Sequence, residues 1–568
     1  MEDDRKNKEY FSINKPWRSN EMVSGLAKAT GRSLMWALGL TRDDFSKPFI
    51  GIVNSHTDIH PGHMHLRQLG EQVRLGIHEA GGRAFEFQTI ALCDGMTMGH
   101  EGMYYVLPSR DWICDTIELM VQGNRLDGLV FIASCDKIEP AMMMAMARLD
   151  IPSIMLTGGP MMPGYFDGKP LACSSVRESA GKWAMGKYTD EEILRIEQTA
   201  CPGPGSCSMS GTANTMACVA ESLGWTLPGC ATSHAQSTEK QRLARASGRE
   251  VVRLVKEDIR PSKITTMANF KNAMSVSSAF GGSTNATLHI PAIAKQMGIR
   301  IKMDDFEAVS QKVPYMVSLI MAGKHTMLEF HEAGGVPVLM KELSPHLDES
   351  TLTVTGKTLG EISKLAENKN PEVVRPLSNP YQPHGSYAIM RGSICPDGGI
   401  VKQTGVAPEM LVHEGPARVF DTEEEAYAEI FGGNITPGDV IVIRYQGPRG
   451  GPGMREMQAA TSALMGVGRG KDSAIITDGR FSGGTHGPCI GHIAPEASEG
   501  GLIAYINNGD RIRIDIPGRT LDLLVPQEEI DRRKREQPLL KKEIKSHVLR
   551  RYAMLVGSAA EGATLSPD

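Results

Sequence analysis

The sequence predicts an α/β protein in two parts: an N-terminal domain with helices covering a mostly parallel sheet, and a C-terminal β-barrel-like domain with flanking helices. In the first part, apolar runs typical of buried strands alternate with helical patterns. In the second part, short β-type runs are separated by glycines. The chain of 568 residues is also longer than one hydrophobic core usually supports. We therefore expect one domain over residues 1–375 and another over residues 385–568.

The N-terminal domain is predicted from strands and helices that follow one another closely, after an irregular arm with one helix at residues 33–40. The predicted strands are short apolar or aromatic runs at residues 49–53, 83–90, 128–133 and 153–157. Helices are expected between them at residues 66–77, 110–122 and 141–148, and the first two carry apolar residues three or four positions apart. Ile113, Ile117 and Met120 are expected on the buried face of the second of these helices. The alternation is typical of βαβ units, so the strands should be parallel.

The C-terminal domain is predicted from a change of pattern. A polar stretch that ends in several prolines, residues 341–384, is expected to connect the two domains. Beyond it, β-type runs cover residues 387–390, 438–445, 473–477 and 511–516. After residue 527 the chain is highly charged and helical. A small β-rich domain with a few helices follows from this pattern.

Composition excludes several classes of protein. Net charge is −5 with 22% charged residues, and no basic run is dense enough to indicate a nucleic-acid partner. The N-terminus lacks the apolar core of a signal peptide, and no apolar run is long enough to span a bilayer. We expect a cytoplasmic protein whose thiols stay reduced. Most of its ten cysteines are then buried fillers, such as Cys114, Cys218 and Cys230, and a few are ligands.

A thiol, a carboxylate and an amine lie side by side at Cys135, Asp136 and Lys137, where a predicted strand gives way to a helix. Ligands bind at this edge of open α/β sheets. The preceding strand also ends in such a pair, Cys93 and Asp94. A soft metal prefers thiolates and a hard cation prefers carboxylates. The repeated pair therefore indicates two metal centres that share one pocket.

Several other loops offer candidate ligands. Residues 201–214 place glycines and prolines between Cys201 and Cys207, which suits an iron–sulfur ligand, although a tight turn into the next helix explains the loop equally. The loop after the first strand carries His56, His60, His63 and His65, which we assign to substrate hydrogen bonding or helix capping rather than to zinc. Gly281 and Gly282 precede Ser283 at a helix start that suits an anion but lacks a nucleotide-binding lysine.

The second domain contributes two glycine-rich loops, each after a predicted strand. One carries Glu456, which is either a site carboxylate or a solvated surface acid. The other carries Ser482, which is either a catalytic hydroxyl or a turn residue. No motif of serine acyl-transfer enzymes accompanies Ser482.

Two long motifs are similar to signatures of the dihydroxyacid dehydratase and phosphogluconate dehydratase family: residues 135–145 and residues 474–485. The resemblance covers nearly the whole chain. It implies an iron–sulfur hydro-lyase that forms a homodimer or homotetramer, with the site near the domain and subunit interface. It further implies that Cys135 and Cys207 bind the cluster, and that Ser482 is the catalytic base. The Mg²⁺ ligands that it implies are Asp94, Asp136, Glu456 and Lys137, the last as a carbamylated lysine.

One position departs from the family pattern. Members with a 2Fe-2S cluster carry a cysteine where this chain has Gly62. A third thiolate must then come from elsewhere, and we expect it from Cys93, because Cys93 neighbours Asp94 as Cys135 neighbours Asp136. Cys201 is the alternative. This arrangement resembles the 4Fe-4S subgroup of the family rather than the 2Fe-2S type.

The resemblance implies a small-molecule substrate, a 2,3-dihydroxy carboxylic acid that loses water to give a 2-keto acid. The sequence leaves open whether this serves branched-chain amino-acid biosynthesis, with a small apolar substrate tail, or carbohydrate catabolism, with a sugar acid (aldonate) as substrate. A broad-range enzyme would accept both. Two other classes remain as alternatives: a redox iron–sulfur protein without a magnesium pocket, and a Mg²⁺ enzyme whose cysteines are only structural.

Overall fold

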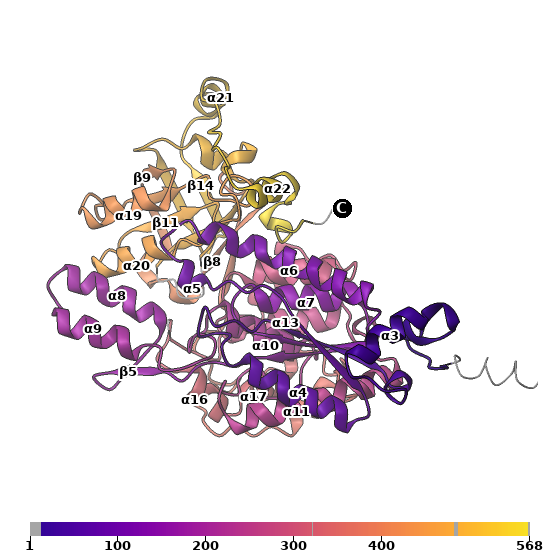
Figure 1. Cartoon of the computed structure of the whole chain (residues 1–568). Helices are drawn as coiled ribbons and strands as arrows, with labels where there is room; N and C mark the ends of the chain where they lie inside the picture. The colour runs from indigo at the N-terminus through magenta and orange to yellow at the C-terminus, as the bar shows by residue number, and fades with distance from the viewer. Residues whose placement is uncertain (1–12, 321, 482–486, 566–568) are drawn as a thin grey trace, which may run out of the picture.

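The computed structural model describes residues 13–320, 322–481 and 487–565. Two sheets organise this part of the chain (Figure 1). The first has four parallel strands in the order β2-β1-β3-β4, and the second has eight strands in the order β14-β13-β9-β10-β11-β12-β8-β7. The predicted fold class is confirmed: one parallel, helix-covered sheet and one barrel-like sheet.

The parallel sheet consists of β1 (Phe49–Asn54), β2 (Arg83–Gln88), β3 (Gly128–Ala133) and β4 (Ser153–Thr157). Helices α4 (Leu66–Glu79) and α11 (Thr238–Glu257) pack against each other on one face, and α6 (Met103–Gly123) and α7 (Ile138–Leu149) cover the other (Figure 1). Strands β1, β3 and β4 are wholly buried, as their continuous apolar runs predict. Because the strands are parallel, their carboxyl ends lie along one edge of the sheet.

The second sheet nearly closes on itself. Its strands are β7 (Tyr387–Met390), β8 (Gly398–Lys402), β9 (Val412–Phe420), β10 (Val440–Ile443), β11 (Ala474–Thr477), β12 (Cys489–Ala494), β13 (Arg511–Asp515) and β14 (Thr520–Leu523). The edge strands β7 and β14 meet through a bridge between Arg391 and Thr520. Side chains alternate along β10: Val440 and Val442 enter one apolar core, whereas Ile441 and Ile443 enter another.

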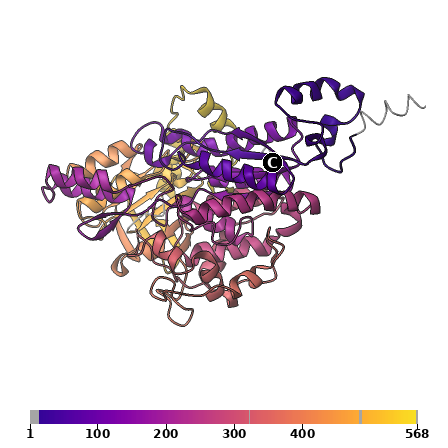
Figure 2. The ribbon, with the colours of Figure 1, turned by 60° about the horizontal axis from the view of Figure 1, so that its bottom comes forward.

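The remaining helices fill the space around the two sheets. The N-terminal arm carries α2 (Asn20–Val23) and α3 (Ala29–Ala37), and it projects from the body in Figures 1 and 2. The other helices between the sheets in sequence are α5 (Asp94–Thr97), α8 (Cys173–Ala184), α9 (Asp190–Thr199), α10 (Thr212–Ser222), α12 (Pro261–Ile264), α13 (Met267–Ala279), α14 (Ala286–Lys295), α15 (Met303–Ser310), α16 (Met327–Glu332), α17 (Gly335–Glu342) and α18 (Leu359–Lys364). Those of the C-terminal half are α19 (Glu423–Phe431), α20 (Gln458–Gly466), α21 (Gln527–Glu536) and α22 (His547–Leu555). A short hairpin pairs β5 (Gly164–Phe166) with β6 (Lys169–Leu171).

The stretch at residues 341–384, expected to connect the two domains, contains α18 and buries Val373 and Val374 in a helical core. Two kinds of local prediction were wrong. Met120 was expected on a buried face but is 41% exposed, while Ile113 and Ile117 are buried. Four strands of the second sheet (β8, β9, β12 and β14) were not predicted, because glycines or alternating charged residues interrupt their apolar pattern.

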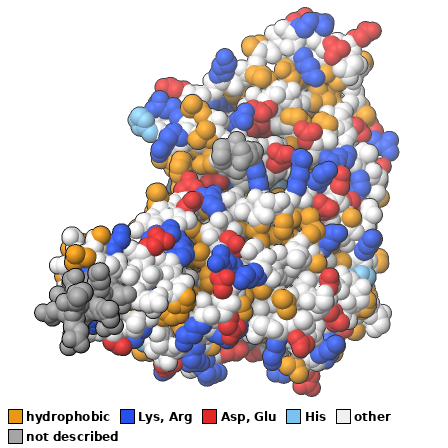
Figure 3. Space-filling model, turned by 90° about the vertical axis from the view of Figure 1, so that its right-hand side faces the viewer, with side chains coloured by type: hydrophobic (Ala, Val, Ile, Leu, Met, Phe, Trp, Pro, Cys, Tyr) orange, Lys and Arg blue, Asp and Glu red, His pale blue; other side chains and the backbone are white. Residues whose placement is uncertain are grey.

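Figure 3 shows lysines, arginines and acidic residues interspersed over one face, without an extended basic area. Within the described residues, no helix is both long and apolar enough to cross a membrane.

Candidate active site

The turn between β3 and α7 carries Cys135, Asp136 and Lys137. Cys135 has a φ of +65°, a left-handed conformation that is unusual for a residue with a side chain and that often marks functional sites. Pro140 lies in the first turn of α7, where its missing N–H does no harm. Lys137 is fully buried, and Cys135 is 8% exposed. The turn therefore directs all three side chains into the protein at the carboxyl edge of the sheet.

The second Cys–Asp pair lies opposite the first. Asp94 begins α5, directly after Cys93, and the Lys137 ammonium lies 2.6 Å from the Asp94 carboxylate. A hydrogen bond between the two thiols lowers the pKa of Cys93, whereas the same contact, together with burial, raises the pKa of Cys135. The structure thus brings the two Cys–Asp pairs together.

Three carboxylates converge on one point. Asp94, Asp136 and Glu456 each offer an oxygen atom, and the three atoms lie within 4.8 Å of one another. The Lys137 ammonium lies 3.7 Å from Asp136 and 3.6 Å from Glu456. Burial, reinforced by the charge of Asp94, raises the pKa of Asp136 to about 7. The backbone N–H of Ala213, at the start of α10, donates to Asp136 at 3.2 Å. Such a crowded set of acids is what a divalent cation would neutralise.

Glu456 reaches this point from the second sheet and is only 2% exposed, so it is no surface acid. It follows β10 in a loop and is held by Arg480 at 3.0 Å and by the Asn285 amide at 3.4 Å. Arg480 is fully buried and also donates to the carbonyl of Met454 at 2.6 Å. The sequence reading did not assign a role to Arg480 or Asn285. Only their place next to glycine-rich loops could have indicated one.

A second pair of thiols joins Cys135 and Cys93. Cys207 lies in the loop before α10, and its sulfur is 3.3 Å from that of Cys173, the first residue of α8. Their contact lowers the pKa of Cys173, and with burial it raises the pKa of Cys207. Cys201 is exposed and makes no such contact in the described structure. Sequence reasoning missed Cys173, because the strand before it, β6, is only three residues long and no carboxylate neighbours the cysteine.

The space beside Cys135 explains why position 62 is a glycine. A Cβ atom on Gly62 would lie 2.5 Å from the Cys135 sulfur, so any side chain there would force that sulfur to move. The Asp94 Oδ1 atom is also buried without a hydrogen-bond partner among the described residues. The close packing beside the Cys135 thiol and the unpaired carboxylate oxygen of Asp94 are both compatible with a metal-binding site.

Two histidines of the loop after β1, His63 and His65, contact the backbone of neighbouring loops. These buried histidines contact backbone carbonyls: the ring nitrogens of His63 lie 2.6 and 2.8 Å from the oxygens of Ser55 and Ser134, and Nε2 of His65 lies 2.9 Å from that of Gly158. His60, His63 and Cys135 do offer three ligand atoms within 4.8 Å of one another. His63, however, would have to give up a carbonyl contact to bind a metal. We therefore interpret His63 as a structural residue that links the loops after β1 and β3 through these contacts.

The predicted base, Ser482, lies outside the described residues. The residue before it, Phe481, is buried, and its carbonyl accepts a hydrogen bond from Thr284 at 2.9 Å. Thr284 belongs to the loop that the sequence suggested for an anion. In the structure, polar side chains of that loop contact other parts of the protein, including Glu456 through Asn285.

The sequence matches two models of one protein family. Residues 47–362 match the N-terminal model of the dihydroxy-acid/6-phosphogluconate dehydratases, and residues 372–563 match the C-terminal model.

Curated relatives match over nearly the full length. The dihydroxy-acid dehydratase of Methanothermobacter thermautotrophicus is 50% identical over 96% of this chain and 100% of its own. Dihydroxy-acid dehydratase 1 of Methanosarcina acetivorans is 50% identical, and the dihydroxy-acid dehydratase of Nitratidesulfovibrio vulgaris is 49% identical, each over 96% of this chain and 99% of its own. The chain therefore belongs to the dihydroxy-acid/6-phosphogluconate dehydratase family and is a hydro-lyase.

Proposed function

We propose that the protein removes water from a 2,3-dihydroxy carboxylic acid to give a 2-keto acid, with an iron–sulfur cluster, Mg²⁺ and a serine base. One observation carries the proposal: a set of thiols and a set of carboxylates lie in the same buried pocket, on adjacent residues of the same two turns. Cys93 and Cys135 belong to the first set, and Asp94 and Asp136 to the second.

The thiols that would hold the cluster are Cys93, Cys135 and Cys207. Three thiolates suit a 4Fe-4S cluster better than a 2Fe-2S cluster, since they leave one iron without a protein ligand. The steric limit at Gly62 supports a third thiolate from Cys93 rather than from that position. The exposure of Cys201 argues against the alternative.

The residues that would hold Mg²⁺ are Asp94, Asp136, Glu456 and Lys137. The Lys137 ammonium now lies among the three carboxylates. Carbamylation would replace its positive charge with an anionic oxygen donor, and a bound cation would favour that form. Arg480 and Asn285 fix the Glu456 carboxylate in place, so the geometry of the donor set does not depend on the substrate.

When bound, the two metal groups would supply Lewis acidity: Mg²⁺ toward the carboxylate and 2-hydroxyl, and the cluster toward the 3-hydroxyl. Ser482 would accept the proton from C2, although a serine hydroxyl is too weakly acidic to act without nearby positive charge. The C3–O bond would then break, and the departing hydroxide would take up a proton, overall the one removed from C2, to leave as water. The resulting enol would tautomerise to the 2-keto acid by protonation at C3. Neighbouring side chains keep bulk water out, because Lys137 and Glu456 are almost fully buried.

The test is 2-keto acid formation by anaerobically purified protein with Mg²⁺, using 2,3-dihydroxyisovalerate, gluconate, a pentonate and glycerate. We expect turnover of at least one substrate, and loss of turnover in Glu456→Gln. A protein with intact cluster that turns over none of them, but cycles reversibly with an electron donor, would instead be a redox iron–sulfur protein. Activity in colourless, iron-free protein would refute the role of the thiols.

The third thiolate is tested by iron and sulfide content after anaerobic reconstitution. We expect Cys93→Ser to lose the 4Fe-4S cluster and Cys173→Ser to retain it. The reverse result would make Cys173, which lies 3.3 Å from Cys207, the third ligand.

The wider assignments also remain proposals. We propose domains at residues 1–375 and 385–568, a homodimer or homotetramer, and a cytoplasmic location. The names of the relatives support a dihydroxy acid as substrate. With dihydroxyisovalerate as that substrate, the enzyme would serve branched-chain amino-acid biosynthesis.

A further inference from the structure

Cys173 is a thiol that the proposed chemistry leaves unused. It is the first residue of α8, and its sulfur lies 3.3 Å from that of Cys207, which is proposed to bind the cluster. A 4Fe-4S cluster with one iron open to substrate needs three protein thiolates, and Cys93 and Cys135 are proposed as the other two. The fold therefore places a spare thiol in direct contact with a cluster ligand.

Hydrogen bonds join the two chain segments that carry this pair of cysteines. The Ser208 hydroxyl donates to the carbonyl of Leu171 at 3.3 Å, and the Ser174 hydroxyl donates to the sulfur of Met209 at 3.2 Å. These four residues lie within two positions of Cys173 or Cys207 along the chain. The backbones on which the two thiols sit are thus tied to each other directly beside the sulfur contact.

The loop that carries Cys207 is also fixed from other directions. The Asn214 side-chain amide, on α10, donates to the carbonyls of Cys207 and Met209 at 2.5 and 2.7 Å. On the other side of Cys207, the carbonyl of Ser206 accepts a hydrogen bond from the backbone N–H of Met161 at 2.8 Å. The position of this cysteine is therefore set by the fold on both sides.

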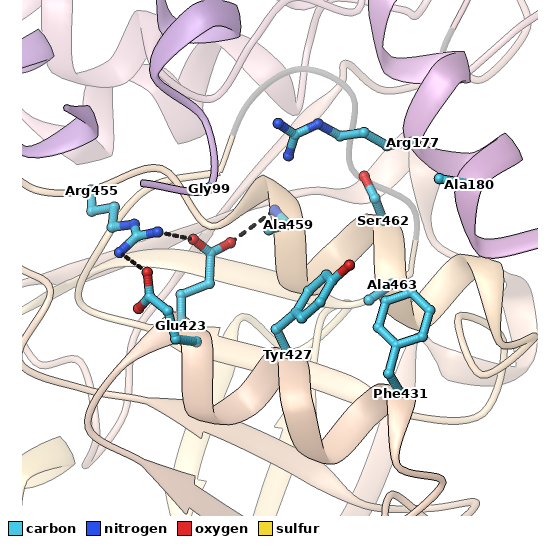
Figure 4. A pocket seen from close by; sticks show the side chains of 11 residues that line it. Gly99, Arg177, Ala180, Glu423, Tyr427, Phe431, Arg455, Ala459, Ser462 and Ala463 are labelled. Carbon is cyan, nitrogen blue, oxygen red and sulfur yellow. Dashed lines mark hydrogen bonds and ion pairs between the residues drawn. The ribbon is translucent and has the colours of Figure 1, made fainter. Parts of the chain in front are cut away.

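The helix that begins at Cys173 is held in place as well. A Cβ atom on Gly181 of α8 would lie 2.7 Å from the Cα of Gly466, so α8 and α20 pack with their backbones nearly in contact. Figure 4 shows Arg177 and Ala180 of α8 on the right of a pocket of about 440 Å³ that α20 also lines. Cys173 cannot move far from its partner thiol without displacing this helix.

The two thiols are placed to react with each other. Their sulfur atoms need to approach from 3.3 Å to the roughly 2.05 Å of a disulfide, a movement that side-chain rotation can supply. Both are partly exposed, whereas Cys114, Cys218 and Cys230 are buried. A small oxidant can therefore reach this pair more easily than most other cysteines of the protein.

We propose that Cys173 and Cys207 form a reversible disulfide when the cluster is lost under oxidation by a peroxide. Hydrogen peroxide first oxidises one thiol to a sulfenic acid and releases one water. The other thiol then attacks that sulfur and expels its oxygen as a second water. Two S–H bonds and one O–O bond break, one S–S bond forms, and the peroxide oxygens are reduced. A dithiol reductant returns both cysteines to thiols.

The consequence is protection of Cys207. A sulfenic acid without a neighbouring thiol is oxidised further to sulfinic and sulfonic acids, which a dithiol cannot reduce. A disulfide stops this sequence at a stage from which the thiolate is recovered. Formation of the disulfide does not depend on the proposed function, but its value in preserving a cluster ligand does. Cys173 thus acts as a resolving thiol rather than as a catalytic residue.

The experiment treats reconstituted full-length protein with hydrogen peroxide until iron is released, alkylates the remaining free thiols, and maps tryptic peptides by mass spectrometry. Cys173 is the one cysteine in the peptide 149–177, and Cys207 lies in the peptide 196–240. We expect these peptides to be linked, with a mass two hydrogen atoms below their sum. The matched control Cys201→Ser, which removes an exposed thiol of the same loop, should show the same link.

A second measurement follows recovery. After treatment with dithiothreitol, iron and sulfide, the wild-type protein and Cys201→Ser should regain their cluster. Cys173→Ser should load a cluster normally before peroxide treatment, but should regain severalfold less iron after it, with Cys207 heavier by two or three oxygen atoms.

Three results would overturn this inference. One is alkylation of Cys173 as a free thiol in the oxidised wild-type protein, and another is equal recovery of iron by Cys173→Ser and the wild type. The third is failure of Cys173→Ser to load a cluster before any oxidation, because Cys173 would then be a cluster ligand. The proposed function fails by a different observation, which is absence of turnover in protein with a full cluster.

Discussion

Removing the Arg480 guanidinium should destabilise the protein far more than removing an exposed arginine at the same distance from its partner. Arg480 is fully buried and lies 3.0 Å from Glu456, whose other nearby cation, Lys137, is 3.6 Å away. Arg480→Met leaves a buried carboxylate without its closest cation and the Met454 carbonyl without its donor. Breaking a buried pair in this way costs about 3–5 kcal/mol, a large part of the usual 5–15 kcal/mol of folding stability.

The matched control is Arg511→Met. Arg511 lies 2.9 Å from Glu414, almost the same distance, but both side chains are about half exposed. Such a pair contributes roughly 0–1 kcal/mol. Urea denaturation of the metal-free proteins is monitored by tryptophan fluorescence and by circular dichroism. It gives the urea concentration at the midpoint of unfolding for each variant. Equal midpoints for Arg480→Met and Arg511→Met would refute the view that Arg480 neutralises a buried acid.

Three other predictions follow from the geometry. Cys93→Ser should lose its 4Fe-4S cluster, measured as iron and sulfide per chain, and full iron content would reject Cys93 as a ligand. Gly62→Ala should lower the cluster content, because the new Cβ would lie 2.5 Å from the Cys135 sulfur. The control Gly203→Ala should keep its cluster, since the nearest atom to its new Cβ is 3.5 Å away. Equal iron contents in the two variants would contradict this prediction. Burial raises the pKa of Glu221 from 4.5 to about 7, so its stabilising contribution is fully present below pH 4.5 and is lost as pH rises through 7. In the wild-type protein, the denaturation midpoint should therefore fall between pH 4.5 and 7 by an amount that Glu221→Gln does not show. Identical plots of midpoint against pH for the two proteins would disprove this prediction.

The sequence was most informative about the first sheet and its edge. Buried parallel strands form continuous apolar runs, so β1, β3 and β4 could be located almost to the residue. Residues that follow the parallel strands of one sheet lie at the same edge. Cys93 and Asp94, after β2, could therefore be placed near Cys135 and Asp136, after β3. The prediction for Glu456 depended on the family resemblance, since nothing local distinguishes it from a surface acid.

Other features depend on contacts that local patterns do not encode. Cys173 meets Cys207 across 34 positions of sequence. Arg480 and Asn285 are 195 positions apart, yet both contact Glu456. Strand β9 was missed because its exposed side chains are charged, and a half-exposed strand is recognised only when its apolar positions alternate clearly. Long-range packing, rather than propensity, decides these positions.

The central claim is that water leaves C2 and C3 of a dihydroxy acid through an enol. The most direct test is proton NMR of the product formed in D₂O by anaerobically reconstituted enzyme, with product incubated alone in D₂O as control for exchange. We predict a 2-keto acid that carries one solvent deuterium at C3 and that forms only with both iron and Mg²⁺ present. A product that retains the substrate's C2 hydrogen at C3, or one that forms equally well without iron, would contradict the account.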